Sequence, residues 1–190
     1  LCLIVKNEEE KLEEFLNSVK DYVGEIVIVD TGSNDKTKEI ASKFTNKIFD
    51  FEWRDDFSLA RNYSVSKASG DWILVLDPDE VIDEKDLVKI NEIIKNNNIL
   101  GYRLIQETYY KDKVVSIRGI TRLFQNKKEI NFIYPIHETV RESIKSLNGK
   151  IGKIGIVIKH YPMINKEKNQ YYLKLLKVKK DKYPNSNVDV

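Results

Sequence analysis

Two carboxylates separated by one residue, Asp77 and Asp79, follow an apolar run over residues 72–76. Such a run predicts a buried strand, and open α/β folds hold their ligands where strands end. Carboxylates this close repel one another unless a positive charge lies beside them, and Glu80 adds a third. Mg²⁺ and Mn²⁺ prefer oxygen ligands and are commonly shared between carboxylates and substrate phosphates. The spacing therefore predicts a divalent-metal site that carries a phosphorylated substrate, with ordinary turn chemistry as the alternative.

A second acid, Asp30, ends another apolar run over residues 25–29. It either caps the next helix and orders the turn at Gly32, or hydrogen-bonds a nucleotide base or ribose, as acids do in dinucleotide folds. No G-x-G-x-x-G follows the first strand, and no Gly-Lys-Ser or Gly-Lys-Thr is present. These absences argue against a nicotinamide or flavin dinucleotide and against a P-loop.

Four further side chains are candidates for the same site. Arg61, in a predicted helix, is either a surface residue or a ligand for diphosphate oxygens in fork geometry. His137 and His160 fall at the ends of predicted elements, where sites are often built, although a lone histidine is more often structural. Glu138 is a candidate general base, and His160 a further metal ligand.

The elements that would position these residues differ between the two halves of the chain. In the first half, predicted strands over residues 1–5, 25–29, 48–51 and 72–76 alternate with predicted helices, which is typical of parallel βαβ units. We expect Asn7 to cap the first helix, with the acids at positions 8–10 in its first turn. After residue 100 the pattern predicts two hairpins, residues 102–109 with 114–117 and residues 122–124 with 130–133, then a strand over 154–160 and a helix over 167–183.

The composition limits the class of protein. Lys and Arg number 32 against 30 Asp and Glu, so the strongly basic surface of a nucleic-acid-binding protein is absent. No apolar run approaches the roughly 20 residues of a transmembrane helix, which leaves peripheral contact with a membrane open. The single cysteine, Cys2, fits a reducing compartment, and we expect a cytoplasmic location. The start at Leu1, inside a predicted strand, indicates a domain trimmed from a longer protein, from which a leader could have been lost.

Taken in order, these motifs resemble a family 2 glycosyltransferase of the GT-A fold. The resemblance rests on residues 4–9, 25–37, 61–62 and 76–80, and covers nearly the whole chain. Residues 121–124, 136–138 and 160–161 resemble one branch, which includes lipopolysaccharide core glucosyltransferases and bacteriocin S-glycosyltransferases. Pro78 stands where relatives often have alanine, but the spacing of the carboxylates is kept.

The resemblance implies an α/β fold with a mostly parallel central sheet, helices on both faces and a more antiparallel C-terminal half. Residues 1–190 would form one catalytic domain: residues 1–100 bind the nucleotide sugar, residues 101–165 complete the acceptor and catalytic half, and residues 166–190 form a C-terminal helix. Members of this branch often continue into helical repeats, so a repeat domain is expected beyond the chain.

The same resemblance implies a nucleotide-sugar donor, usually a uridine diphosphate sugar, and Mn²⁺ or Mg²⁺. Nucleotide-sugar binding would fall to Glu8, Asp30, Arg61 and Asp77, and metal binding to Asp79 and His160. A peptide, protein or glycan acceptor would attack the anomeric carbon from the opposite face, with inversion. Glu138 is the first candidate for the base that deprotonates the acceptor, and His137 the second.

Two alternatives belong to other functional classes. A nucleotidyltransferase would normally need a glycine-rich basic loop after its first strand, whereas residues 6–10 are mostly acidic and contain no glycine. A nucleotide-sugar-binding module that has lost transfer activity would keep the donor site and differ only in the chemistry.

Overall fold

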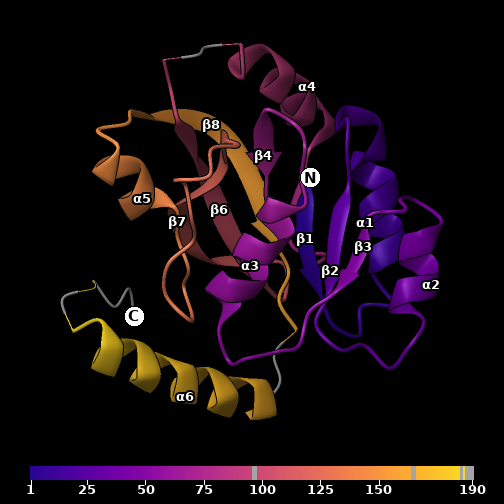
Figure 1. The fold of residues 1–190 in the computed structure, drawn as a ribbon. Helices are drawn as coiled ribbons and strands as arrows, with labels where there is room; N and C mark the ends of the chain where they lie inside the picture. Colours follow the sequence, from indigo (N-terminus) through magenta and orange to yellow (C-terminus); the bar gives the residue numbers. More distant parts are fainter. Residues whose placement is uncertain (96–97, 164–165, 185, 187–190) are drawn as a thin grey trace.

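The computed structural model describes residues 1–95, 98–163, 166–184 and 186, and confirms an α/β fold (Figure 1). A parallel sheet has the order β1-β2-β3, and a mixed sheet has the order β4-β7-β6-β8-β5. A parallel bridge between Cys2 and Val75 joins the two.

The strands are β1 Cys2–Val5, β2 Val27–Asp30, β3 Ile48–Asp50, β4 Trp72–Leu74, β5 Glu80–Ile82, β6 Gly101–Tyr110, β7 Lys113–Gln125 and β8 Ile151–His160. The helices are α1 Leu12–Val19, α2 Thr37–Ser42, α3 Phe57–Ser66, α4 Glu84–Ile93, α5 Arg141–Ser146 and α6 Lys166–Lys182, with a 3₁₀ turn, η1, at Lys20–Tyr22.

Helices cover both faces of the sheets. On one face, Leu3 and Val5 of β1 share a core with side chains of α1, α2 and α4. On the other face, Cys2 belongs to a core that includes Ile144 of α5, and Ile4 packs with Ala60 of α3. Successive side chains of a strand point to opposite faces of the sheet. Because each face of β1 packs against a hydrophobic core, every position of β1 is apolar.

The first helix begins later than the sequence pattern predicts. Asn7 has a positive φ of 54° and caps no helix, because α1 begins at Leu12. Instead, Asn7 Oδ1 accepts a hydrogen bond from the Asn34 amide at 2.9 Å, and the Asn7 amide donates to Ser33 Oγ at 2.8 Å. Asn7 therefore ties the loop after β1 to the loop after β2, at the edge where ligands were expected.

Of the two predicted hairpins, the first, residues 102–109 with 114–117, is confirmed, and the second, residues 122–124 with 130–133, is wrong. The turn of the first hairpin is formed by Lys111 and Asp112, whose φ values of 47° and 60° are the positive values that a tight hairpin turn of this kind needs. Strand β7 then runs to Gln125, with Leu123 and Phe124 in register with both β4 and β6, and Arg122 at a shift in the register with β6. Residues 130–133 belong to an irregular segment in which Ile133 bridges Thr139. The chain does turn after β7, with a hydrogen bond from the Ile130 amide to the Lys127 carbonyl at 2.9 Å, but β7 has β4 and β6 as its neighbours in the sheet.

The predicted C-terminal helix is confirmed as α6, which runs along the lower side of the molecule (Figure 1). Leu175 is fully buried, and Tyr171 Oη accepts from Trp53 Nε1 at 2.6 Å and donates to Asp55 Oδ1, also at 2.6 Å. Within the predicted range 166–190, residue 185 and residues 187–190 lie outside the described residues, as do residues 96–97 after α4. Helix α6 thus packs on the segment that leads into α3.

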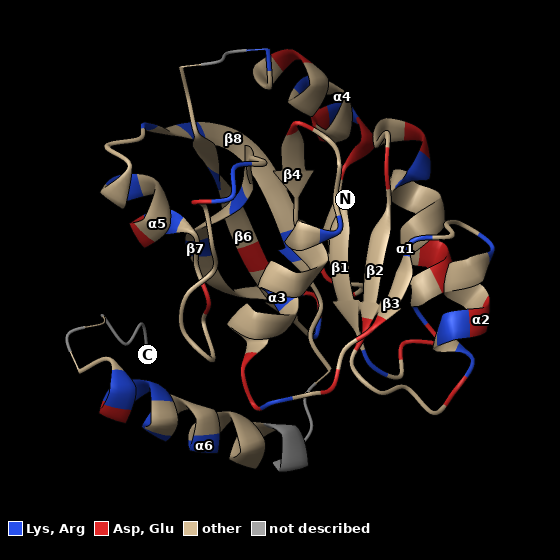
Figure 2. Cartoon of the chain, viewed as in Figure 1, with Lys and Arg blue, Asp and Glu red and all other residues tan. Residues whose placement is uncertain are grey.

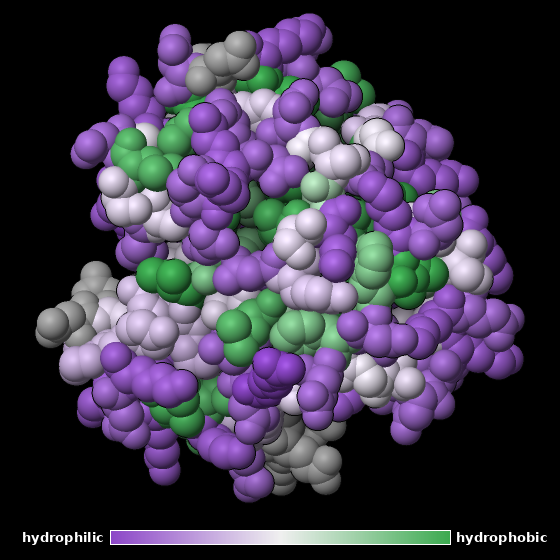
Figure 3. Space-filling view, viewed as in Figure 1, coloured by the Kyte–Doolittle hydropathy of each residue, from purple (hydrophilic) through white to green (hydrophobic). Residues whose placement is uncertain are grey.

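The face drawn in Figure 3 mixes polar and apolar side chains. Both signs of charge are spread over the helices, and apolar side chains form small patches between polar ones (Figures 2 and 3). None of the helices in the described part of the chain is both long and apolar enough to cross a membrane.

One carboxylate at the opposite edge of the sheet gives a pH-dependent contribution to stability. Glu25 accepts hydrogen bonds from the Ser69 amide and hydroxyl, each at 2.8 Å, and from the Gly70 amide at 3.3 Å, and it pairs with Lys47. Burial raises the pKa of Glu25, but these bonds outweigh burial and lower it to about 2. A depressed pKa stabilises the fold above the unfolded-state pKa near 4.5, and this contribution is lost as the pH falls towards 2.

We therefore expect Glu25→Gln to lower the free energy of unfolding by about 1–2 kcal/mol at pH 7, after allowance for solvent screening. The loss should shrink between pH 4.5 and pH 3, which urea denaturation at several pH values would measure. Glu13→Gln is the matched control, because Glu13 is 52% exposed and pairs only with Lys43. An equal effect of both substitutions at pH 7 would contradict the prediction.

Candidate active site

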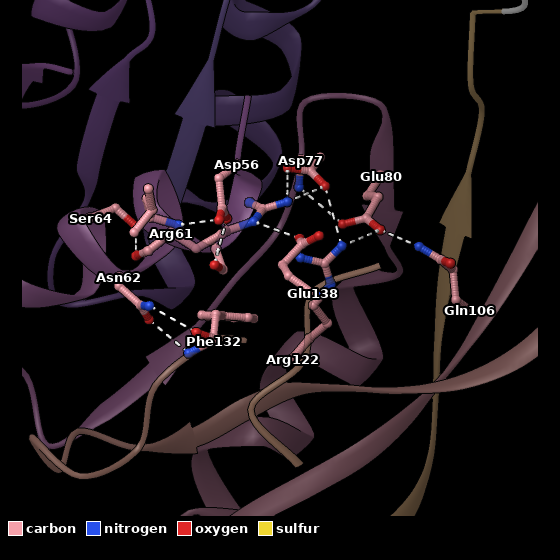
Figure 4. Close-up of polar contacts among 12 residues, drawn as sticks. Asp56, Arg61, Asn62, Ser64, Asp77, Glu80, Gln106, Arg122, Phe132 and Glu138 are labelled. Carbon is pink, nitrogen blue, oxygen red and sulfur yellow. Dashed lines mark hydrogen bonds and ion pairs between the residues drawn. The ribbon is translucent and has the colours of Figure 1, made fainter. Parts of the chain in front are cut away.

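The loop after β4 meets Arg61 of α3 and side chains from the second half of the chain (Figure 4). The carboxyl ends of β1 and β2 lie side by side in the parallel sheet. Val5 pairs with Asp30 in register, so the two strands end together. Asp77 and Asp79 lie in the loop between β4 and β5, and His160 ends β8 beside β5. Most of the predicted site residues are thus brought to one edge, as expected for an open α/β sheet.

Arg61 is the centre of the polar cluster. Its side chain is only 4% exposed, so the alternative of a surface arginine is wrong. Nη2 binds Asp77 Oδ1 at 2.7 Å and Oδ2 at 2.8 Å, and Nε donates to Glu138 Oε1 at 3.1 Å. Nη1 is buried and has no protein partner among the described residues. A helix of the first half therefore joins the acid of the β4–β5 loop to the candidate base of the second half.

Asp77 lies between two arginines. Besides Arg61, Arg122 of β7 approaches Asp77 Oδ2 through Nη2 at 3.3 Å. Burial acts to raise the pKa of Asp77, but the charges of Arg61 and Arg122 outweigh it, and the pKa lies below its ordinary value. The countercharge that the acid pair requires is therefore supplied in part by the protein. The sequence pattern marked Arg122 only by its place in a motif.

Glu80, the third acid, does not face the open edge. It is 1% exposed, and its Oε2 accepts from the Asp77 amide at 3.0 Å. Its Oε1 accepts from Gln106 Nε2 and lies 3.7 Å from Arg122 Nη2. Burial raises the pKa of Glu80. The three acids of residues 77–80 thus divide into two that stay partly exposed and one that turns into the core, a distinction that sequence spacing does not contain.

Asp79 and His160 form the pair expected to bind metal. Asp79 Oδ2 lies 3.6 Å from His160 Nε2, and the side chains are 20% and 21% exposed. The loop is fixed by a hydrogen bond from the Tyr161 amide to the Asp79 carbonyl at 2.8 Å, and His160 Nδ1 lies 3.3 Å from Thr108 Oγ1. A partner on Nδ1 leaves Nε2 as the nitrogen that can bind a cation.

The donor set fits a cation shared with a substrate. Within the described residues, no group of three or more His, Cys, Asp or Glu side chains is placed to hold a metal ion. Mg²⁺ and Mn²⁺ commonly take one or two protein ligands and fill the other positions with phosphate oxygens and water. A carboxylate and an imidazole are suitable for this role, and Asp77, already held by two arginines, is less available.

Asp30 keeps one oxygen without a protein partner. Its Oδ1 accepts from the amides of Gly32 and Ser33 at 2.8 and 2.7 Å, so it orders the turn at Gly32, whose φ is 104°. Its Oδ2 is buried and has no partner among the described residues. A buried carboxylate oxygen of this kind is costly unless something hydrogen-bonds it. The position is suitable for a ligand hydroxyl or imide N–H.

Glu8 lies in the loop after β1, at the sheet edge where Asp30 ends β2, and lines a small cavity. Its amide donates to Thr37 Oγ1 at 2.7 Å, which fixes the loop after β1. The cavity has a volume of about 200 Å³ and includes Asp35 and Met163 in its wall. The structure thus places Glu8 in the loop after β1, with space for a ligand beside it, and Asp30 lies outside the wall of this cavity.

His137 and Glu138 are adjacent in sequence but point in different directions. Glu138 is 11% exposed and faces Arg61, whereas His137 is exposed and has a positive φ of 52°. Helix α3 holds their loop: Asn62 exchanges two hydrogen bonds with the Phe132 backbone, at 2.7 and 2.9 Å. The Phe57 amide adds a bond to the Pro135 carbonyl at 3.0 Å. The geometry favours Glu138 over His137 as the base.

The family model for glycosyl transferase family 2 matches residues 1–170. A TPR repeat-containing protein of Synechococcus elongatus is 40% identical over 147 residues, which are 77% of this chain and 36% of that protein. The SPbeta prophage-derived glycosyltransferase SunS of Bacillus subtilis is 29% identical over 139 residues, which are 72% of this chain and 33% of SunS. The chain therefore spans about a third of the length of these two relatives.

Solved structures share the fold at low sequence identity. Staphylococcus aureus TarS 1–349 in complex with UDP-GlcNAc superposes with a TM-score of 0.69 at 16% identity, covering 98% of this chain and 66% of that one. Glucosyl-3-phosphoglycerate synthase from Mycobacterium tuberculosis, in complex with Mn²⁺ and UDP-glucose, has a TM-score of 0.65 at 14% identity and covers 99% of this chain and 79% of that one.

Proposed function

The chain belongs to glycosyl transferase family 2, and from this we propose that it transfers a sugar from a UDP-linked donor, with inversion and with Mn²⁺ or Mg²⁺. The observation that carries the metal-dependent part is the pair formed by Asp79 and His160 at the open edge of the sheet. The two neighbouring structures that hold UDP-GlcNAc and UDP-glucose support the choice of donor. The acceptor class is a peptide, a protein or a glycan.

Each residue has one task in this proposal. Glu8 and Asp30 Oδ2 bind the nucleoside. Asp77 and Arg61 bind the ribose and the diphosphate of the donor. A cation held by Asp79 and His160 would stabilise the charge on the departing diphosphate. Glu138, oriented by Arg61 Nε, accepts the proton of the attacking acceptor group. The acidic loop after β1, closed by Asn7, disfavours the triphosphate site of a nucleotidyltransferase.

Donor binding tests the proposal directly. A UDP-sugar present at 100 times its dissociation constant should add about 2.7 kcal/mol to the free energy of unfolding. We expect a clear rise in the melting temperature with UDP-sugar and Mn²⁺ together, and a smaller rise without Mn²⁺. In Asp79→Asn, the difference that Mn²⁺ makes should be largely lost, because a carboxylate ligand is replaced by a neutral amide.

Glu92→Gln is the matched control, since Glu92 is 72% exposed and pairs with Lys95 at the end of α4. A metal-dependent shift that survives in Asp79→Asn would contradict the assignment of Asp79. The absence of any shift with UDP-sugars in the unmodified protein would contradict the proposed donor. Donor binding without transfer or donor hydrolysis would favour the alternative of a binding module.

A further inference from the structure

Glu80 is an unusual residue to bury, because a carboxylate in the core is costly unless its partners compensate. Its partners are the Asp77 amide, Gln106 Nε2 and Arg122 Nη2. Two of these three lie in the loop or ion cluster of the candidate active site. The side chain therefore links the acidic loop to strand β6 and shares one arginine with Asp77.

Strand β6 holds both sides of the candidate metal pair. Gln106 and Thr108 lie two residues apart, so they lie on the same face of the strand. Gln106 binds Glu80, which follows Asp79 in the chain, and Thr108 contacts His160. The register is consistent with this, because Glu80 and Thr108 both pair with His160 across the sheet.

The orientation of the Gln106 amide is fixed by a second strand. Arg118 Nε of β7 donates to Gln106 Oε1 at 2.6 Å, which directs Gln106 Nε2 towards Glu80. Two hydrogen bonds therefore connect the three side chains: Arg118 donates to Gln106, and Gln106 donates to Glu80. These hydrogen bonds require an acceptor at position 80 on the side of β6, and the Glu80 carboxylate also lies 3.7 Å from Arg122 Nη2.

We propose that Glu80 is a positioning residue that sets the cation affinity of Asp79 and His160 through its charge and its hold on the acidic loop. This inference rests on the proposed function. Arg122 lies near both Glu80 and Asp77, so its positive charge is shared between the two carboxylates. Asp77 is therefore less completely neutralised, and the loop that contains Asp77 and Asp79 keeps more negative charge to attract a cation. Removal of the charge should therefore weaken cation binding even where every hydrogen bond is kept.

A reciprocal exchange separates charge from hydrogen bonding. In Glu80→Gln alone, two amides face each other, and rotation of Gln106 would set its NH₂ group against Arg118. In the double variant Glu80→Gln with Gln106→Glu, the new glutamine can accept from the Asp77 amide and donate to the new glutamate, which can accept from Arg118. The total charge is unchanged, but the carboxylate has moved from Arg122 to Arg118.

We expect Glu80→Gln to lower the urea midpoint, and the double variant to regain most of that loss. The dissociation constant of Mn²⁺ in the presence of UDP, measured by calorimetry, should nevertheless stay about tenfold or more above that of the unmodified protein. Glu92→Gln, at an exposed residue, is the matched control. Mn²⁺ affinity equal to that of the unmodified protein in a stable double variant would overturn the proposal.

The outcomes distinguish this inference from the proposed function. If the unmodified protein binds no Mn²⁺ with UDP, the proposed function fails first. Should the double variant not fold, Glu80→Asp provides the test, because it keeps the charge near Arg122 but shortens the reach to Gln106. Mn²⁺ affinity nearer to that of the unmodified protein in Glu80→Asp than in Glu80→Gln supports the role of the charge, and equal losses overturn it.

Discussion

Replacement of Arg61 by methionine is expected to lower the free energy of unfolding by about 3–5 kcal/mol. Methionine fills much of the same volume but leaves Asp77 and Glu138 without the cation that both of them bind. Breaking a buried ion pair by removing one partner is costly, because the remaining charges are desolvated and uncompensated. The loss should be larger here than for a single pair, since two carboxylates share Arg61.

Urea denaturation at pH 7 measures this effect, with Arg54→Met as the matched control. Arg54 is 65% exposed and lies 4.0 Å from Glu52, so its replacement should change stability by less than about 0.5 kcal/mol. A loss below about 1 kcal/mol for Arg61→Met would mean that Asp77 and Glu138 are well solvated or carry a proton. Arg61 would then not be the centre of the cluster.

The second large effect concerns catalysis. Glu138→Gln should lower the rate of sugar transfer by a factor of about 10²–10⁴, the usual contribution of a general base. Glutamine can still accept the bond from Arg61 Nε, so the fold and the affinity for UDP with Mn²⁺ should change little. Initial transfer rates and calorimetric donor binding, measured on the same preparations, would separate the two quantities.

His137→Gln is the natural comparison, since His137 lies next to Glu138 but on the exposed side of the loop. We expect it to keep most of the transfer rate. Near-normal transfer in Glu138→Gln together with a large loss in His137→Gln would reverse the assignment of the base. Equal large losses in both would point to the shape of the loop rather than to one proton acceptor.

The buried strands of the first half were predictable, because residues 1–5 and 25–29 are apolar at nearly every position. The start of α1 was not, since Asn7 has a capping side chain but uses it on Asn34, a partner 27 residues away. The second hairpin failed for a related reason: residues 122–124 look like a short strand before a turn, yet they continue β7. Local sequence shows which segments are extended and not which neighbours they find.

The candidate site was predictable in composition but only partly in geometry. Acids at the ends of predicted strands indicated which edge of the sheet would hold the site. The spacing of Asp77 and Asp79 correctly indicated that a positive charge must lie beside them. Sequence order could not show that Arg61 and Arg122 supply part of it, because both depend on contacts between distant elements. For the same reason it did not distinguish the inward Glu80 and Glu138 from the outward His137.

Helix α3 is attached to the loop of Glu138 at three places, through Phe57, Arg61 and Asn62. These positions span little more than one turn of a rigid rod, on which each residue advances the axis by about 1.5 Å. The same helix binds Asp77 through Arg61. The distance between Asp77, on the side of the nucleotide-sugar donor, and Glu138, the candidate base, therefore depends on the geometry of α3.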